Sequence, residues 1–369
     1  MRPPAFDGSG PAWLVAEIGS NHDGSLEKAR ALIDASAEAG WDAVKFQLFR
    51  ADHLYPKECG VVELATGPVD FYAELARVEL DAAWLPELRA HAESRGLHFL
   101  CTPFDEDAVD ELVAAGVPAL KIASPELNHL PLLRRAAASG LPLICSTGLS
   151  TLSDVEEALG AIRGVRPGAS ITVLQCVTAY PAPPEESNLA VLETLARAFG
   201  VPVGLSDHST DPELVPAVAV ACGASLIEKH VTLDRRDPGL DHAFAIEPEG
   251  MRRLREAVRR TESFAPEARL AQVERTYGRE RVRATLGHGR KEVMPSEAPL
   301  YPCDKRSIHA IRAIRAGEPL AADAIRVVRS ERNLRPGLHP RHWEDVLGAR
   351  ARVDIQPGDG IRWTHLIER

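Results

Sequence analysis

The sequence predicts an α/β protein: a (β/α)8 barrel (TIM barrel) followed by a small, mostly β domain. Three observations carry this prediction. Apolar strand-like runs alternate with helical runs up to about residue 264, and the alternation gives eight strand–helix pairs. Eight such pairs in about 250 residues is what a (β/α)8 barrel requires. After about residue 303 the pattern changes to short strands and turns. We therefore assign residues 1–285 to the barrel, 286–302 to a linker and 303–369 to the C-terminal domain.

The expected strands are short aliphatic runs, at residues 13–18, 43–48, 97–102, 119–124, 142–147, 171–177, 201–206 and 225–231. The expected helices cover residues 25–39, 71–78, 82–94, 106–115, 130–138, 153–162, 189–199, 212–221 and 249–264. Several of these helices begin at Ser or Asp and several end at Gly. Residues 50–70 are expected to form a long irregular loop. An open doubly wound sheet is less favoured, because no G-x-G-x-x-G follows the first strand.

Composition limits the function. The chain has 369 residues, of which 45% are hydrophobic, and no apolar run is long enough to span a bilayer. Residues 1–11 lack the features of a signal peptide and are interpreted as a loose leader. The net charge of −10 argues against a broad nucleic-acid interface, although a local lysine cluster can still bind a small anion.

The six cysteines show no C-x-x-C spacing, and several lie within apolar strand-like runs. We interpret them as small buried hydrophobic residues in a reducing compartment, rather than as disulfides or metal ligands. A cytoplasmic protein without a membrane anchor is the expectation that follows.

Two apolar runs end in polar clusters that each contain one histidine, His208 and His230. The helix predicted between them makes the two strands parallel neighbours, so both histidines should emerge at the same end. Two neutral imidazoles, flanked by Asp207 and Glu228, suit an open divalent-metal site. The alternative is that each imidazole only forms hydrogen bonds with its neighbours.

Charged residues interrupt several of the apolar strands: Glu17, Lys45, Lys121 and Glu228. Burying such groups is costly unless they have partners, and active sites of (β/α)8 barrels lie at the C-terminal ends of the strands. Converging at that mouth, these residues could hold an anion and a cation together. Structural ion pairs among them are the alternative.

The segment from residue 265 to 302 is charged and rich in Arg, Gly, Pro and Glu, and it is expected to be a helix that runs into a linker. The domain that follows is too small to depend on a large core of its own. We expect it to dock against another surface.

Several motifs occur in an order that resembles the sialic acid synthase (N-acetylneuraminate synthase) family. They are AEIGSNHDG at 16–24, KFQ at 45–47, KIAS at 121–124, STG at 146–148, GLSDH at 204–208, EKH at 228–230, DPGLDH at 237–242 and EP at 247–248. The C-terminal segment, which begins with KRSI at 305–308, resembles the antifreeze-like (SAF) domain that ends these enzymes.

The resemblance implies a barrel that binds phosphoenolpyruvate and a divalent metal, Mn²⁺ or Mg²⁺. The acceptor would be an open-chain N-acylated hexosamine such as N-acetylmannosamine, and the products a nine-carbon 2-keto sugar acid and phosphate. A 2,4-diacetamido-trideoxy-hexose, leading to legionaminic or pseudaminic acid, or another sugar aldehyde is the alternative acceptor. The family is typically a domain-swapped homodimer in which each SAF domain covers the barrel mouth of its partner.

The same resemblance implies the site residues. The metal would be bound by His208 and His230. Phosphoenolpyruvate would be bound by Lys45, Lys121, Ser124, Thr178 and Ser206. Catalysis and acceptor binding would involve Glu17, Asp241, Glu228, Gln47, Tyr180 and Arg335. Glu17 would steady the acceptor or the attacking water, and Asp241 could also transfer a proton.

Two departures from the family pattern concern selectivity. Some relatives carry Asn where Thr178 stands. The family's Arg-Pro-Gly-x-Gly turn is present here only as Arg335-Pro336-Gly337, without the second glycine, so Arg329 and Arg332 are rivals to Arg335.

Other functions remain open at this point. One is a metal-dependent barrel aldolase or isomerase that does not use phosphoenolpyruvate, against which the retention of both Lys45 and Lys121 argues. Another reading makes Lys121 a Schiff-base lysine. A non-catalytic sugar-binding protein is the third.

Overall fold

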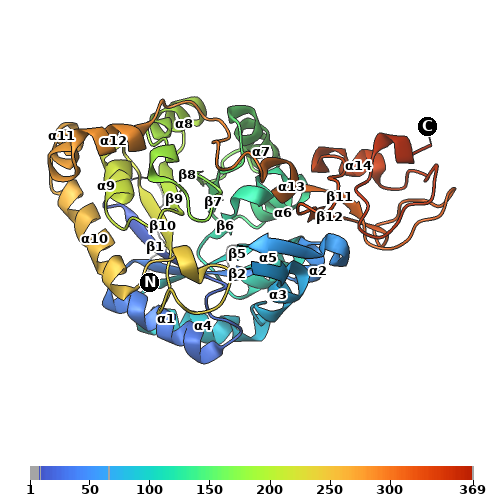
Figure 1. Ribbon diagram of the computed structural model, residues 1–369, viewed down its shortest axis with the longest axis horizontal. Coiled ribbons are helices and arrows are strands. Elements are labelled where there is room, and N and C mark those ends of the chain that lie inside the picture. Colours follow the sequence, from blue (N-terminus) through green and yellow to red (C-terminus); the bar gives the residue numbers. More distant parts are fainter. Residues whose placement is uncertain (1–7, 9, 65–66, 368–369) are drawn as a thin grey trace.

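The computed structural model describes residues 8, 10–64 and 67–367, and it forms a closed barrel with a C-terminal domain at one side (Figure 1). The eight barrel strands are β1 (Trp13–Gly19), β2 (Ala43–Leu48), β5 (His98–Pro103), β6 (Leu120–Ile122), β7 (Leu143–Ser146), β8 (Ile171–Cys176), β9 (Val203–Asp207) and β10 (Leu226–His230). All neighbouring strands are parallel, and β1 closes the barrel by pairing with both β2 and β10. The predicted barrel is confirmed. Most of the expected leader, residues 1–11, lies outside the described residues.

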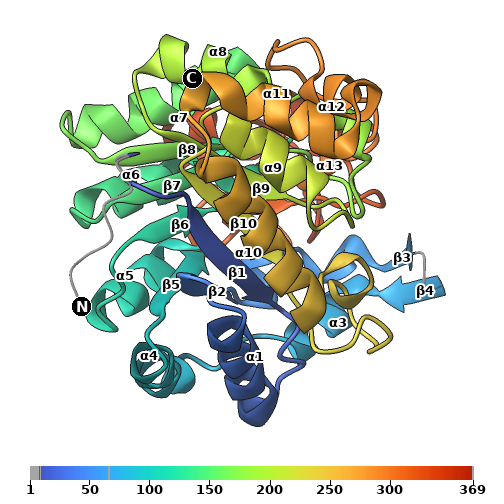
Figure 2. The same ribbon diagram turned by 90° about the vertical axis from the view of Figure 1, so that its left-hand side faces the viewer.

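Helices surround the barrel, and Figure 2 shows α1 and α10 lying along its outer side. They are α1 (Leu26–Glu38), α4 (Leu85–Ser94), α5 (Glu106–Ala114), α6 (Leu130–Ala138), α7 (Leu152–Val165), α8 (Val191–Phe199), α9 (Leu214–Ala221) and α10 (Pro248–Glu262). Two of them have start signals of the expected kind, since the Ser25 hydroxyl caps α1 and the Asp105 carboxylate caps α5. At α7 the cap is Thr151, which forms a capping box with Asp154 and lies two residues before the expected start.

The interior of the barrel is layered, because alternate strand residues point inward. One layer is apolar and consists of Val15, Ala43, Leu100, Ala119, Ile144, Leu174 and Leu226. The residues two positions further along the same strands also point inward, and they are Glu17, Lys45, Thr102, Lys121, Ser146, Cys176 and Glu228. An apolar floor thus lies directly below a polar mouth, and the mouth is at the C-terminal ends of the strands.

The segment after β2 is more ordered than the sequence predicted. It contains α2 (Ala51–Leu54), a 3-10 turn η1 (Lys57–Cys59) and an antiparallel hairpin of β3 (Val61–Leu64) and β4 (Gly67–Asp70). The prediction of an irregular loop over residues 50–70 was wrong, whereas the helix predicted after it is present as α3 (Phe71–Arg77). The aromatic and aliphatic side chains of the segment form a separate apolar cluster with Phe104 from the end of β5, and this packing gives the segment its structure.

The expected helix-and-linker segment also differs. It forms two helices, α11 (Pro266–Tyr277) and α12 (Arg279–Leu286), and then an extended stretch that lies against the barrel before α13 (Tyr301–Asp304). The Asn188 side chain binds this stretch, since it accepts from the His288 and Gly289 backbone N–H groups and donates to the Arg290 carbonyl. The beginning of the stretch is therefore held to the barrel.

The C-terminal domain has one two-stranded antiparallel sheet, β11 (Arg306–Ala310) and β12 (Ile325–Arg329), with isolated β-bridges and a short helix α14 (Trp343–Val346). Its core is a small cluster that includes Ile308, Leu320 and Ile361. The mostly β character agrees with the prediction. β12 itself was not anticipated.

This domain docks on the barrel of its own chain, and a buried arginine lies at the centre of the contact. Arg306, only 1% exposed, donates to the Glu126 carboxylate and to the backbone carbonyls of His53, Phe104 and Val327. Glu126 also accepts from Arg329 of β12 at 2.7 Å. We call Glu126, Arg306 and Arg329 the interdomain joint. The expected docking is confirmed, and it links the C-terminal domain to the loops after β2, β5 and β6.

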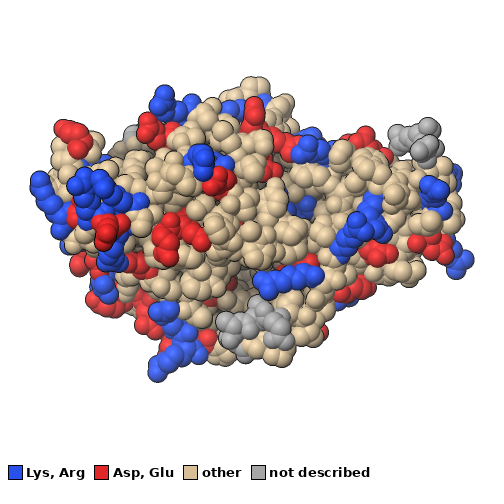
Figure 3. All heavy atoms as spheres, turned by 45° about the horizontal axis from the view of Figure 1, so that its top comes forward, with Lys and Arg blue, Asp and Glu red and all other residues tan. Residues whose placement is uncertain are grey.

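Each of the six cysteines is a free thiol, and five of them are buried, as expected for small core residues. Within the described part of the chain, none of the helices combines the length and apolar character needed to cross a bilayer. On the face shown in Figure 3, acidic and basic side chains are interspersed.

Candidate active site

A cavity of about 500 Å³ opens at the C-terminal ends of the barrel strands. Its polar lining comes from the layer described above and from the loops that follow the strands. Its apolar wall consists of Phe104, which follows β5, and of side chains from the segment after β2: Phe49, Leu54, Tyr55, Val62, Phe71 and Leu75. Four residues of the C-terminal domain, Asp304, Arg329, Glu331 and Arg332, complete the rim.

Two lysines and two carboxylates form a buried cluster inside the cavity. Lys45 Nζ lies 2.5 Å from Glu17 Oε2 and 3.8 Å from Glu228 Oε2, and Lys121 Nζ lies 3.3 Å from Glu228 Oε1. Ser206 Oγ donates to Glu228 at 2.9 Å. The structural ion pairs considered above therefore exist. They also place two ammonium groups beside open volume, which is the arrangement an anionic substrate needs.

Proton affinities in this cluster are strongly perturbed. Burial raises the pKa of Glu17 to about 7, and Lys45 only partly offsets that effect. Burial also acts to raise the pKa of Glu228, but Lys121 and Lys45 outweigh it and the pKa of Glu228 is lowered. The two carboxyl groups are therefore separated in acidity. Glu17 can exchange a proton near neutral pH, whereas Glu228 stays ionised.

The two predicted metal ligands lie side by side, with ring centroids 5.4 Å apart. His208 Nδ1 lies 2.8 Å from the Val177 carbonyl, which leaves Nε2 as the ligand atom. His230 Nδ1 is buried and has no hydrogen-bond partner, and burial, followed by the neighbouring His208, lowers the pKa of His230 well below its usual value. A neutral imidazole with a free nitrogen is what a divalent cation requires, so this pair fits a metal.

The environment of His208 makes its protonation, and therefore its ability to bind a cation, dependent on pH. Burial disfavours its charged form, but Cys176 and the Val177 carbonyl outweigh burial and raise the pKa of His208. A cation would have to displace that proton. Tyr180 and Phe244 form an aromatic wall here, with the Tyr180 ring 4.4 Å from His208 and the Phe244 ring 4.9 Å from His230.

Asp241 stands beside the histidines on the loop that follows β10. Its Oδ2 accepts from Ser20 Oγ at 3.0 Å and lies 3.7 Å from His230 Nδ1. Burial raises the pKa of Asp241. The carboxyl group is thus within reach of both the β1 loop and a predicted metal ligand.

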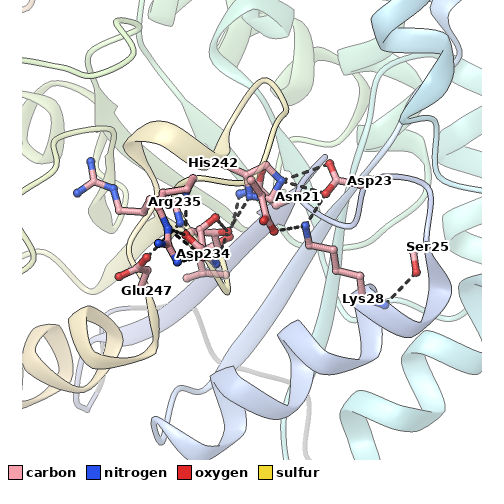
Figure 4. A network of polar contacts seen from close by, with 12 residues as sticks. Asn21, Asp23, Ser25, Lys28, Asp234, Arg235, His242 and Glu247 are labelled. Atoms are coloured by element: carbon pink, nitrogen blue, oxygen red, sulfur yellow. Dashed lines mark hydrogen bonds and ion pairs between the residues drawn. The ribbon is translucent and has the colours of Figure 1, made fainter. Parts of the chain in front are cut away.

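A polar network anchors that loop to the loop after β1 (Figure 4). Lys28 Nζ lies 2.5 Å from Asp23 and 2.6 Å from Asp237, while His242 lies 2.7 Å from Thr232 Oγ1 and 3.2 Å from Asp23. Asp23, Asp237 and His242 are close enough together to suit a metal ion. The Lys28 ammonium already occupies the space between the two carboxylates, so we interpret the group as a salt-bridged anchor that holds Asp241 in place.

Most of the predicted site residues line the cavity: Glu17, Lys45, Gln47, Lys121, Ser124, Tyr180, Ser206, His208, Glu228, His230 and Asp241. Thr178 does not. Gly148 packs over its hydroxyl, since a Cβ at Gly148 would lie 2.1 Å from Thr178 Oγ1. Arg335 is exposed and also lies outside the lining, whereas its two rivals, Arg329 and Arg332, contribute to it.

Several lining residues received no role from the sequence, and three of them contact predicted site residues: Thr102, Ser20 and Phe244. Thr102 accepts from Lys45 Nζ at 3.0 Å, and Ser20 donates to Asp241. The sequence could have indicated both residues, because Thr102 ends a predicted strand and Ser20 belongs to the first motif. Phe244 had no such signal, since an isolated aromatic residue in a loop has no distinguishing pattern.

The fold and the site together define a class of protein: a (β/α)8 enzyme whose mouth combines two buried lysines with a pair of ligand-competent histidines. The comparison with known families agrees. A model described as the NeuB family matches residues 32–269, and a model described as the SAF domain matches residues 305–367. The chain belongs to the NeuB family of transferase-type sugar-acid synthases and carries a C-terminal SAF domain. The resemblance noted in the sequence is confirmed.

Individual relatives match over nearly the full length. The spore coat polysaccharide biosynthesis protein SpsE of Bacillus subtilis is 40% identical, over 97% of this chain and 94% of the relative. The N,N'-diacetyllegionaminic acid synthase of Legionella pneumophila is 34% identical, over 96% of this chain and 94% of the relative. The crystal structure of the Bacillus subtilis SpsE protein superimposes with a TM-score of 0.81 at 38% identity, covering 98% of this chain and 96% of that one.

Proposed function

We propose that this enzyme condenses phosphoenolpyruvate with an open-chain N-acylated hexosamine to give a nine-carbon 2-keto sugar acid and inorganic phosphate. Carbon 3 of phosphoenolpyruvate forms a bond to the aldehyde carbon, water adds at carbon 2, and phosphate leaves by C–O cleavage. The observation that carries the proposal is the placement of Lys45 and Lys121 beside His208 and His230 in one cavity.

Phosphoenolpyruvate carries a phosphate and a carboxylate, and its binding needs cations and hydrogen-bond donors. Lys45, Lys121, Ser124 and Ser206 all line the cavity and meet that need. Glu17 and Glu228 hold the two ammonium groups in place before substrate arrives. Thr178 lies behind Gly148, so its hydroxyl would not contact phosphoenolpyruvate in this arrangement.

His208 and His230 would hold the divalent metal, Mn²⁺ or Mg²⁺. When bound, a divalent metal supplies Lewis-acid polarisation of the acceptor aldehyde and a template that orients the two substrates. The chain prepares both rings for this role, since Val177 fixes the orientation of His208 and burial keeps His230 neutral.

The acceptor would lie between the histidines and the apolar wall, in contact with Gln47 and Tyr180. Glu17 is positioned by Gln47, whose amide donates to Glu17 Oε1 at 2.6 Å. With a pKa of about 7, Glu17 can take a proton from the attacking water. Asp241, whose pKa is raised by burial, is placed to deliver or accept a proton at the acceptor oxygen.

The family resemblance implies a domain swap, whereas here the C-terminal domain docks on the barrel of its own chain. We further propose a homodimer in the cytoplasm in which the exposed Arg335 of one chain reaches the acceptor site of the other. The family resemblance favours N-acetylmannosamine as the acceptor, whereas the similarity to the N,N'-diacetyllegionaminic acid synthase favours a 2,4-diacetamido-trideoxy-hexose. Both belong in the test.

The test measures phosphate release from phosphoenolpyruvate with Mn²⁺, with and without each acceptor. The His208→Ala variant is the control. Release that requires one sugar and disappears in the variant would support the proposal and identify the acceptor. Absence of phosphoenolpyruvate binding to the folded protein by calorimetry would refute it and favour a metal-dependent aldolase.

A further inference from the structure

Glu297 lies in the stretch between the two domains, outside every motif that suggested the site, yet it is fully buried against the barrel. Its Oε1 accepts from the backbone N–H groups of Leu149 at 2.7 Å and Thr178 at 2.8 Å. Its Oε2 accepts from the Met294 N–H at 2.9 Å. One carboxylate from the interdomain stretch therefore ties together the loops after β7 and β8.

The turn that Glu297 binds is an unusual one. Leu149 is completely buried and has a φ of +53°, in the left-handed region that residues other than glycine rarely adopt. Such a conformation persists only where surrounding contacts hold it. The hydrogen bond from the Leu149 N–H to Glu297 is a direct contact of that kind.

The turn acts on the site through Gly148. The Gly148 N–H donates to Ser124 Oγ at 2.9 Å, and Ser124 lines the cavity. The hydroxyl oxygen accepts this bond, so its own hydrogen remains the donor: it bonds to the Cys176 sulfur here and could turn to an anionic oxygen in the cavity. This close approach requires glycine at position 148, because a Cβ there would lie 2.9 Å from Ser124 Oγ and 3.2 Å from Glu297 Oε1.

We propose that Glu297 is a positioning residue for the anion-binding part of the active site. It fixes the turn at Gly148 and Leu149 and the Thr178 backbone, and through the Gly148 N–H it sets the orientation of the Ser124 hydroxyl. The inference rests on the proposed function, because phosphoenolpyruvate is the anion. The stretch between the domains would then contribute to substrate binding, in addition to connecting the two domains.

Two conservative variants at Glu297 distinguish the effect of side-chain length from the effect of charge. Glu297→Gln keeps an oxygen that can accept from Leu149 and Thr178 but removes the charge, whereas Glu297→Asp keeps the charge and shortens the side chain by one methylene. Glu292→Asp is the matched control, because Glu292 belongs to the same stretch and its half-exposed side chain pairs with His288. For each protein we would measure kcat, both KM values, the calorimetric Kd for phosphoenolpyruvate, and Tm.

We expect Glu297→Asp to raise KM and Kd for phosphoenolpyruvate about tenfold, with acceptor KM changed less than about twofold. Glu297→Gln should change the phosphoenolpyruvate values only about threefold, and Glu292→Asp should match wild type. A folded Glu297→Asp with wild-type Kd for phosphoenolpyruvate would overturn the inference. The inference would also be overturned if the KM values for both substrates rose equally and Tm fell in parallel. Wild-type protein that binds no phosphoenolpyruvate would instead remove the proposed function, and this inference with it.

Discussion

Two groups of buried charges in this protein have opposite properties. In the interdomain joint every nitrogen of the Arg306 guanidinium donates to a protein oxygen, and Glu126 accepts from two arginines. At the barrel mouth some buried polar atoms, such as His230 Nδ1 and Ser146 Oγ, have no hydrogen-bond partner among the described residues. The hydrogen bonds of the Arg306 guanidinium are therefore complete, whereas the described part of the mouth leaves some buried polar atoms without one.

The difference separates structural from functional burial of charge. A satisfied ion pair holds two surfaces together, and removing one partner leaves an uncompensated charge. An unsatisfied polar group lowers stability, and it persists where binding or chemistry uses it. Variants at the joint should therefore affect folding, and variants at the mouth should affect turnover. Four predictions test that division.

The largest effect is expected at the joint. Arg306→Ala leaves Glu126 buried with only Arg329 as its cationic partner and opens the contact with three barrel loops. We expect the free energy of unfolding to fall by about 3–5 kcal/mol, measured by urea denaturation. Arg326→Ala is the control, because Arg326 lies on the same small sheet and makes one hydrogen bond, to the Asp52 carbonyl. A loss below about 1 kcal/mol for Arg306→Ala would show that the joint is not structural.

At the mouth, Glu17→Gln should keep the fold and lower kcat/KM by about 10²–10³-fold. In the wild type the ionised form of Glu17 acts as the base. As the pH falls through about 7 this form is lost, so the rate should decrease on the acid side. The variant should lack that decrease. A pH–rate profile measured for both proteins decides the point, and an unchanged acid limb in Glu17→Gln would assign it to another group.

Metal affinity should depend on pH through His208. Its pKa is raised, so protons compete with the cation, and the affinity for Mn²⁺ should fall up to about tenfold for each pH unit below that pKa. Titration with Mn²⁺, followed by electron paramagnetic resonance of the free ion, measures this without turnover. A pH-independent affinity, or equal binding by His208→Ala, would contradict the assigned ligand.

The smallest effect is expected on the exposed part of the C-terminal domain. Arg335→Ala should raise the acceptor KM by about tenfold or less and leave the phosphoenolpyruvate KM unchanged. Mixing Arg335→Ala with His208→Ala chains should restore one intact site per mixed dimer if Arg335 serves the partner's barrel. Arg352→Ala, another exposed arginine of this domain, is the control. Mixtures without restored activity would place Arg335 outside the partner's site.

The sequence by itself determined the barrel and the core of the site. Side chains alternate along a strand with a period of two, so the sequence shows which of them point into the barrel. Parallel strands in a closed barrel all end at the same rim. For that reason Lys45, Lys121, His208 and His230 could be predicted to converge from motifs far apart in the chain. Local signals such as the caps of α1 and α5 could locate these helices from the sequence, because each cap depends on residues within a few positions.

Only the tertiary structure decided which groups support that core. Glu297 reaches Leu149 across 148 positions, and Arg306 reaches Glu126 across 180. Such contacts depend on the path of irregular chain, for which no periodic pattern exists. The placement of Thr178 behind Gly148, and of Arg335 away from its own chain's cavity, follows from the same cause. The sequence specifies what stands at the end of a strand, whereas packing determines what lies beside it.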